Sequence, residues 1–191
     1  HAHSRFLTRT NHMVGRVEHL GPEAANEYVN KAVMREAVVM QMTWVGAPTV
    51  YYGDEAGVCG FTDPDNRRTY PWGHEDKQML LFHKEAIRIH RNSTALCTGS
   101  YKMLYTAWGI LAYGRFDEKE RYTVIVNNTQ DTVNVAIPVW QIGVTDGSRM
   151  EQQLMSSSAS FTKVPDIYVV TDGYLMIAMP KTSAVILKDI G

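Results

Sequence analysis

Hydrophobic positions recur with two different periods along this chain, and the change of period falls near its middle. In residues 24–44 and 76–91, apolar side chains return every three or four positions, which is typical of amphipathic helices. Residues 49–52, which lie between these segments, are all β-branched or aromatic and predict a short strand. The first half is therefore expected to fold as helix, strand and helix, which is one and a half repeats of a βα unit.

The second half alternates apolar and polar residues with a period of two, which predicts strands. Polar or charged turn residues separate them. The stretch from residue 143 to residue 170 has no clear period, and the three serines at its centre, residues 156–158, are expected to form an exposed loop tip. Short strands at this spacing indicate an antiparallel sandwich. The predicted strands cover residues 101–106, 110–116, 121–127, 132–137, 174–179 and 183–188.

Two details refine this division. Pro22 and Glu23 favour a helix start just before residue 24, because proline suits the first helical turn and an acid suits the positive end of the helix dipole. The period changes near residues 96–99, so we expect one domain over residues 1–97 and an all-β domain over residues 98–191.

Composition excludes several classes of protein. The 191 residues carry a formal net charge of −1 and no basic stripe, which argues against nucleic acid as a partner. No apolar run reaches the roughly 20 residues that span a bilayer, so no membrane partner is expected. The sequence gives no indication of localisation. Cys59 and Cys97 lie in unlike contexts and predict two free thiols, and the histidines lack the spacing of metal ligands. We therefore predict no cofactor and no metal.

A conspicuous motif follows the first long helical segment. Residues 46–55 are Gly-Ala-Pro-Thr-Val-Tyr-Tyr-Gly-Asp-Glu, and residues 63–67 are Asp-Pro-Asp-Asn-Arg. Pro48 ends the helical pattern, and Gly53 releases the backbone into a loop that carries Asp54 and Glu55. This run resembles the eighth barrel strand and following loop of the alpha-amylase family of glycosidases, nearest its neopullulanase and cyclomaltodextrinase-like branch.

The resemblance implies the fold class, α/β plus all-β: the end of a TIM (β/α)8 barrel over residues 1–97, followed by an antiparallel β-sandwich. Enzymes of the barrel architecture place their sites at the carboxyl ends of the strands. Residues 1–8 resemble the segment after the seventh strand. In that comparison His1 matches a histidine that hydrogen-bonds the sugar beside the cleaved bond, and Ala2 matches the third catalytic aspartate.

Alanine has no oxygen, so position 2 cannot accept the hydrogen bonds that an aspartate accepts there. It could be an engineered inactivation, a cloning residue or a natural loss. Retaining glycosidases also need a nucleophile and an acid, both carboxyl groups, about 5–5.5 Å apart. The resemblance places both before this chain. Asp54 and Glu55 are adjacent and would point to opposite sides of a strand, so we expect them to hold loops at the rim. The chain alone is expected to be inactive.

Asp63 and Arg67 match positions that in neopullulanase-like relatives contact sugars, so they are candidate substrate-binding residues alongside His1. The alternative is a salt bridge that only braces the loop. Aromatic residues leave a similar choice, between offering a face to a sugar ring and packing against the protein. This choice applies to Phe61, Trp72, Trp108 and Trp140.

The sequence thus predicts the carboxyl-terminal portion of a hydrolase that cleaves α-glucosidic bonds, with an α-glucan oligosaccharide as its partner. The alternative is a non-catalytic carbohydrate-binding or assembly module. Residues 49–52 would leave an apolar strand with unpaired edges in this chain, which favours self-association.

Overall fold

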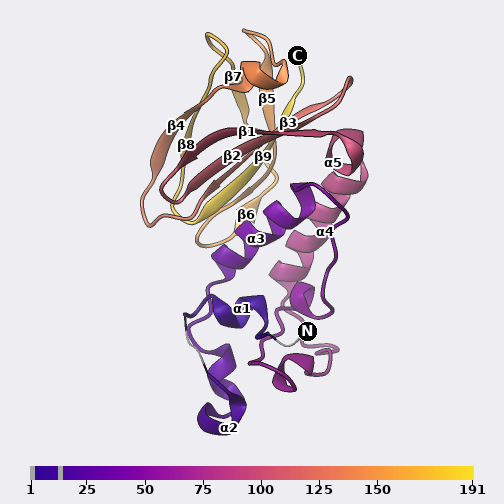
Figure 1. The fold of residues 1–191 in the computed structure, drawn as a ribbon, viewed down its shortest axis with the longest axis vertical. Coiled ribbons are helices and arrows are strands. Elements are labelled where there is room, and N and C mark those ends of the chain that lie inside the picture. Colours follow the sequence, from indigo (N-terminus) through magenta and orange to yellow (C-terminus); the bar gives the residue numbers. More distant parts are fainter. Residues whose placement is uncertain (1–2, 13–14) are drawn as a thin grey trace.

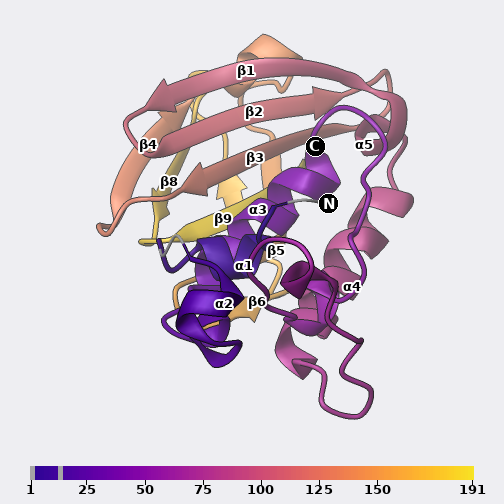
Figure 2. The ribbon, with the colours of Figure 1, turned by 60° about the horizontal axis from the view of Figure 1, so that its bottom comes forward.

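The computed structural model describes residues 3–12 and 15–191. Helices gather at one end of the molecule and strands at the other, and the long helices α3 and α4 lie against one face of the larger sheet (Figure 1). Seen from below, α1 and α2 cover the outer end of this helical part (Figure 2). The helices are α1 (Phe6–Arg9), α2 (Val17–Leu20), α3 (Lys31–Thr43), α4 (Lys77–Arg91) and α5 (Thr94–Thr98).

The strands form an antiparallel sandwich, which confirms the prediction for the second half. The larger sheet has the order β1-β2-β3-β9-β5-β6, with β7 also paired to β5, and the smaller sheet is the β4-β8 pair. The strands are β1 (Ser100–Ala107), β2 (Ile110–Phe116), β3 (Arg121–Asn127), β4 (Val133–Ile137), β5 (Arg149–Ser156), β6 (Phe161–Thr162), β7 (Ile167–Val169), β8 (Leu175–Met179) and β9 (Ser183–Asp189).

Strand β9 is buried on both faces, and it therefore divides two hydrophobic cores. Ala184 and Ile186 face the helices, whereas Val185 and Leu187 face the β4-β8 pair. Side chains alternate between the two faces of a strand, so an unbroken apolar run is what a doubly covered strand requires. The helices are thus packed on the outside of the sandwich, and they share a hydrophobic core with the outer face of the larger sheet.

Arg115 on β2 fastens this helical layer to the sheet. Its guanidinium is buried and donates hydrogen bonds to the carbonyls of Thr43 (2.8 Å) and Trp44 (2.7 Å) at the end of α3. It also donates to the carbonyl of Gly99 (3.1 Å), just after α5. A cation suits this place because the carboxyl end of a helix carries partial negative charge. The sheet therefore fixes where both helices end.

The first long helix begins later than the sequence pattern predicts. Only a short 3-10 turn occupies Glu23–Asn26, and α3 starts at Lys31. Tyr28 has a positive φ of 55°, which interrupts the helix, and Asn30 then caps the new start by accepting from the N–H groups of Ala32 and Val33. By contrast, the second predicted helix agrees with α4, whose cap is Asp76.

Residues 49–52 do not form the predicted strand. Residues 49–51 have no regular secondary structure, Tyr52 begins a turn, and the segment has no ladder partner within the described residues. A parallel strand is stable only beside other strands, and every strand in the described residues is engaged in the sandwich. The described part of the chain therefore does not contain a barrel sheet.

The interval from residue 143 to residue 170 contains β5, which the sequence pattern missed. Ser156 is buried at the end of β5, so the serine run is not wholly a loop tip; Ser158 alone of the three is exposed. A bulge between Gln152 and Leu154 shifts the register against β9. Gln152 is buried, and its amide donates to the carbonyl of Val164 (2.8 Å). Polar residues at inward positions hid the strand.

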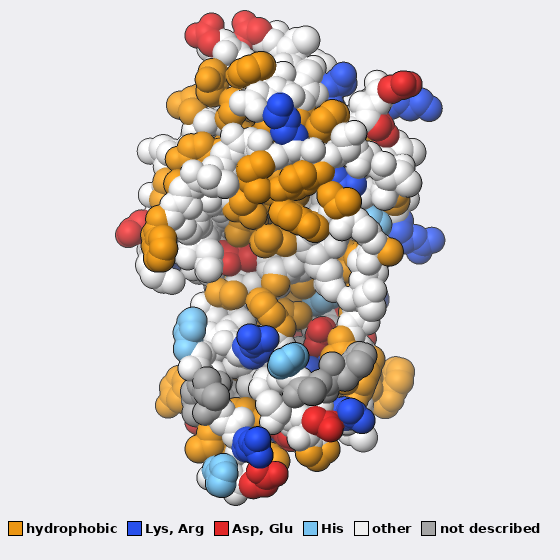
Figure 3. Space-filling view, in the orientation of Figure 1, with side chains coloured by type: hydrophobic (Ala, Val, Ile, Leu, Met, Phe, Trp, Pro, Cys, Tyr) orange, Lys and Arg blue, Asp and Glu red, His pale blue; other side chains and the backbone are white. Residues whose placement is uncertain are grey.

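Hydrophobic side chains gather in the middle of the face shown in Figure 3, at the height where α3 meets the larger sheet. Large apolar side chains with substantial exposure in the helical part include Phe6, Val45 and Tyr52. No helix in the described ranges has both the length and the apolar content needed to cross a membrane.

Candidate functional site

The two segments of the sequence motif lie side by side, joined by Arg5. Its side chain is buried and donates to the carbonyls of Asn66 (2.8 Å) and Tyr52 (2.5 Å). The backbone adds two further links, because the Arg5 N–H donates to the Gly60 carbonyl and the Gly60 N–H donates to the Thr8 hydroxyl, each at 2.9 Å. The loop after residue 52 is thereby fixed against the start of the chain.

Asp54 is the counter-ion of Arg5, at 3.0 Å between Nη1 and Oδ1. The guanidinium also lies over two aromatic rings, 4.0 Å from the centroid of Tyr51 and 4.7 Å from that of Tyr52. Burial raises the pKa of Asp54, and Arg5 only partly offsets the cost of holding this carboxylate out of water. The predicted structural role of Asp54 agrees with this geometry.

Glu55, the next residue, has a buried Oε2 atom that receives no hydrogen bond from any described residue. His83 on α4 is also buried, with Nδ1 2.9 Å from the Met79 carbonyl. Burial lowers the pKa of His83, while the charges of Glu55 and Asp54 act to raise it. The ring is therefore neutral near pH 7, with its proton on Nδ1, and its Nε2 atom is a free acceptor among the described residues.

A second ion pair stiffens the loop. Arg68 donates to both oxygens of Asp65, at 3.0 Å from Nε and 2.9 Å from Nη2, and Asp65 also accepts from the Phe61 N–H at 2.7 Å. Burial alone would raise the pKa of Asp65, but the hydrogen bonds from Arg68 and Phe61 outweigh it and hold the pKa below its usual value. This pair, which the sequence analysis did not single out, braces the loop.

Asp63 and Arg67 form an ion pair of 2.8 Å, but in a different setting. Their side chains are 45% and 58% exposed, so the pair lies at the surface of the loop and its remaining oxygens and N–H groups are open to solvent. Asp63 also borders a cavity of about 270 Å³ together with Arg16, Glu18 and Thr62. The geometry suits either a grip on a ligand or a surface brace.

The aromatic candidates differ in how far their side chains are exposed. Phe61 is fully buried and belongs to the helical core, so it offers no face to a ligand. Trp72 is 80% exposed, and its ring lies against that of Tyr70 with centroids 4.5 Å apart. Trp108, in the turn between β1 and β2, is 96% exposed, and Trp140 is 56% exposed. The alternative of packing against the protein, in the core or at an edge of the sandwich, is therefore wrong for Trp108.

The structure describes the two cysteines, whereas two other candidates lie outside the described residues. His1 and Ala2 fall outside them, so their predicted places are a matter of sequence alone. Cys59 and Cys97 are both free thiols, as predicted. Within residues 3–12 and 15–191, no three His, Cys, Asp or Glu side chains gather as a metal site would require.

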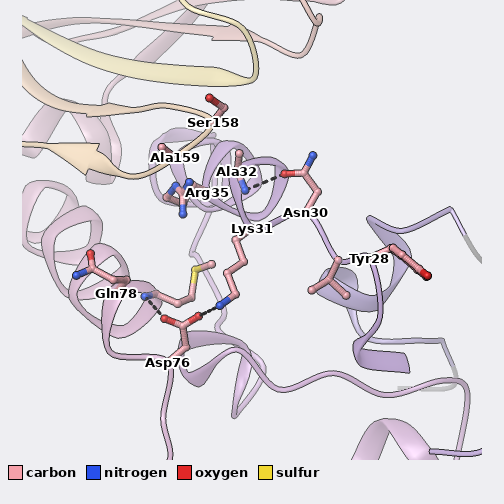
Figure 4. Close-up of a pocket in the computed structure, with 11 residues that line it drawn as sticks. Tyr28, Asn30, Lys31, Ala32, Arg35, Asp76, Gln78, Ser158 and Ala159 are labelled. Carbon is pink, nitrogen blue, oxygen red and sulfur yellow. Dashed lines mark hydrogen bonds and ion pairs between the residues drawn. The ribbon is translucent and has the colours of Figure 1, made fainter. Parts of the chain in front are cut away.

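A cavity of about 530 Å³ opens between the first turns of α3 and α4 and the turn after β5 (Figure 4). Lys31 and Asp76 face each other across it, 2.6 Å apart. Burial raises the pKa of Asp76, but the ion pair with Lys31 and the N–H of Met79 more than reverse this effect. These charges satisfy one another, which makes the pair a link between two helix starts.

Sequence reasoning missed Arg5 and Arg68 as organising residues. Arg5 lies in the segment of residues 1–8 and Arg68 directly follows the segment of residues 63–67, and no local pattern tells a buried arginine from an exposed one. Their partners lie up to 61 residues away for Arg5, at Asn66. The spacing of Asp65 and Arg68, three apart, is the one signal that could have indicated a local pair.

No family model matches the sequence. Known proteins and solved structures do resemble it, and they agree with one another. The chain is 30% identical over 185 residues to an amylopullulanase of Thermoanaerobacter thermohydrosulfuricus, a match that covers 91% of this chain and 12% of that protein. It is 36% identical over 131 residues to a cyclomaltodextrinase of Thermoanaerobacter pseudethanolicus, covering 68% of this chain and 20% of the relative. The chain thus spans a fifth or less of these two proteins.

Among solved structures, an Anoxybacillus alpha-amylase superposes with a TM-score of 0.77 over 99% of this chain and 36% of its own. The two sequences are 23% identical, so this likeness concerns the fold. It includes both the helical part and the sandwich, because nearly the whole chain is covered.

Proposed function

This chain belongs to the alpha-amylase family of glycoside hydrolases, and we propose that it is a carboxyl-terminal portion of an enzyme that cleaves α-glucosidic bonds in maltodextrin, starch or related oligosaccharides with retention of configuration. In this proposal residues 1–97 complete a (β/α)8 barrel and residues 98–191 form the sandwich that packs against it. Residues 49–52 would become the eighth barrel strand once neighbouring strands are present.

The observation that carries the proposal is the loop held by Arg5. The buried guanidinium fixes the motif segments that the resemblance places after the seventh and eighth strands, while Asp63 and Arg67 remain at the loop surface. A carboxylate accepts hydrogen bonds from paired sugar hydroxyls and a guanidinium donates to them. Asp63 and Arg67, with His1, are accordingly proposed as substrate-binding residues.

The carboxylate pair that performs the chemistry would come from the rest of the enzyme. Asp54 is occupied by Arg5, and the sequence places Ala2 where the third acid is expected. The chain alone should therefore release no reducing sugar from maltodextrin above a buffer control. Turnover that survives repurification would contradict this expectation.

A competing function is a non-catalytic carbohydrate-binding or assembly module. The nearly complete exposure of Trp108 favours it, since an exposed indole can stack on a sugar ring or on another protein. The parent open reading frame separates the two. An upstream aspartate and then a glutamate, each at the end of a predicted barrel strand, support the enzyme, and a native start near residue 1 supports the module.

The binding role of Arg67 can be tested in the longer enzyme. Arg67→Ala should weaken productive binding of long oligosaccharides by roughly 1–3 kcal/mol, the scale for a lost hydrogen bond to a charged group, and affect the shortest substrates less. The measurement is kcat/KM across a series of maltooligosaccharides.

Arg68→Ala is the matched control, because Arg68 braces the same loop from within through Asp65. It should lower the melting temperature and reduce kcat/KM for all chain lengths alike. If Arg67→Ala gives this same pattern, Asp63 and Arg67 only brace the loop.

A further inference from the structure

Glu36, in the middle of α3, is a buried residue whose carboxyl group has no hydrogen-bond or ion-pair partner among the described residues. Glu36 is 4% exposed, and its Oε1 atom forms no hydrogen bond with any described residue. Burial raises its pKa to about 8, and no neighbouring charge contributes to this shift. An unpaired carboxylate in such a place is unfavourable, because burial removes it from water and no cation or hydrogen-bond donor replaces the lost solvation.

The carboxyl group borders a cavity of about 340 Å³ at the junction of α3 with the turn between β1 and β2. The rest of the lining carries no charge. It consists of Phe6, Val33, Ala37, Met40, Ala107, Gly109, Ile110, Leu111, Val126 and Asn128. The cavity is therefore mainly apolar, with Glu36 as its one acidic group.

We propose that this cavity is a socket for one basic side chain, lysine or arginine, from a segment of the longer enzyme that packs on α3 beside the sandwich. The aliphatic stem of such a side chain would lie against Val33, Met40 and Leu111, and its charged end would reach Glu36. Long basic side chains suit an apolar wall because their methylene groups can be buried while the charge meets a partner.

Two observations select this occupant. The acid supplies charge complementarity that a purely apolar segment would leave unsatisfied, and this chain spans only 12% of the amylopullulanase and 20% of the cyclomaltodextrinase that it matches. The inference rests on the proposed function, in that it takes the basic side chain from the rest of the enzyme. Arg9, which lines the neighbouring cavity, forms no ion pair with Glu36.

The socket itself can be tested on this chain with n-butylammonium chloride, at a protein concentration where the chain is monomeric. Saturable shifts are expected at the methyl resonances of Ile110 and Leu111, and the pKa of Glu36, followed by its carboxyl 13C signal, should fall by a unit or more. The sign follows because a bound cation favours the ionised carboxylate. Glu36→Gln, which keeps the shape, should weaken binding at least tenfold.

Two controls accompany this measurement. Glu18→Gln removes a carboxylate away from the socket and should change nothing, and n-butanol, with the same stem but no charge, should bind wild type and Glu36→Gln alike. Equal binding of butylammonium to wild type and to Glu36→Gln would overturn the socket, whatever the upstream sequence proves to be.

The source of the basic side chain is tested by a reversal of sign. In this chain alone at pH 8, Glu36→Gln should raise the melting temperature, because it removes an unpaired buried carboxyl group. In the longer enzyme the same substitution should lower it, because it breaks an ion pair. A higher melting temperature in both proteins would overturn the proposed partner. An upstream sequence that lacks the catalytic aspartate and glutamate would overturn only the proposed function.

Discussion

One buried guanidinium joins two segments of the chain that are far apart in sequence, which makes Arg5 the residue on which the loop geometry depends. Arg5→Leu should lower the free energy of unfolding by about 3 kcal/mol, near the lower end of the roughly 3–5 kcal/mol typical of breaking a buried pair, because Asp54 keeps some access to water. Urea unfolding of this chain at pH 7 measures the change.

Arg67→Leu is the control for that measurement. It removes an arginine from an ion pair of similar length but much greater exposure, and should cost less than about 1 kcal/mol. If the two substitutions destabilise the chain equally, burial does not distinguish the two pairs and the organising role of Arg5 is wrong.

At the scale of the helix, Asn30 decides where α3 begins. Asn30→Ala should destabilise the chain by about 1 kcal/mol, because two N–H groups of the first turn lose their acceptor. The melting temperature and the urea midpoint both report the loss. Asn30→Asp retains an acceptor oxygen and should leave stability nearly unchanged; if it is as harmful as alanine, the side-chain cap is not what starts the helix.

The same element shows which features the sequence could predict. Strands β2 and β3 agree with the predicted residues 110–116 and 121–127, because both segments are rich in apolar residues and the turns that bound them are polar or charged. The start of α3 did not, because a helical period continues through Tyr28, whose backbone conformation depends on its surroundings. A local pattern records which face is apolar, and it does not record a backbone reversal.

Strand β5 and residues 49–52 illustrate the two opposite errors. Gln152 and Ser156 take inward positions that hydrogen bonds satisfy, so β5 lacked the expected apolar pattern. Residues 49–52 have a strong strand composition but no neighbouring strand to pair with in the described chain. Partners distant in sequence decided both outcomes, and the same is true of Arg5 at the candidate site.

For the molecule as a whole, the uncovered apolar surface of the helical part favours self-association. Residues 49–52 lack a ladder, and Phe6, Val45 and Tyr52 are substantially exposed. Such surface is costly to leave in water. We expect this chain to form a dimer through the first ~97 residues, most simply with two-fold symmetry, while the sandwich keeps its own core.

Sedimentation velocity over a micromolar concentration series tests this expectation. The sedimentation coefficient should rise with concentration toward that of a dimer. A monomer at every concentration, together with no binding of a dye for exposed apolar surface, would mean that the apolar surface of the helical part is already sufficiently covered in one chain.

The position of Arg115 has a consequence for what happens when the chain is cut. Its guanidinium grips the carbonyls of Thr43 and Trp44 on one side and of Gly99 on the other, and Phe82 of α4 packs edge-on against Phe161 of β6 with ring centroids 5.1 Å apart. A protease that cleaves the chain between α5 and β1 would therefore yield two fragments that co-purify, because these contacts between the helices and the sheet would hold them together. A gene that stops before β1 would encode helices whose apolar side chains no longer pack against the larger sheet. Its product should precipitate.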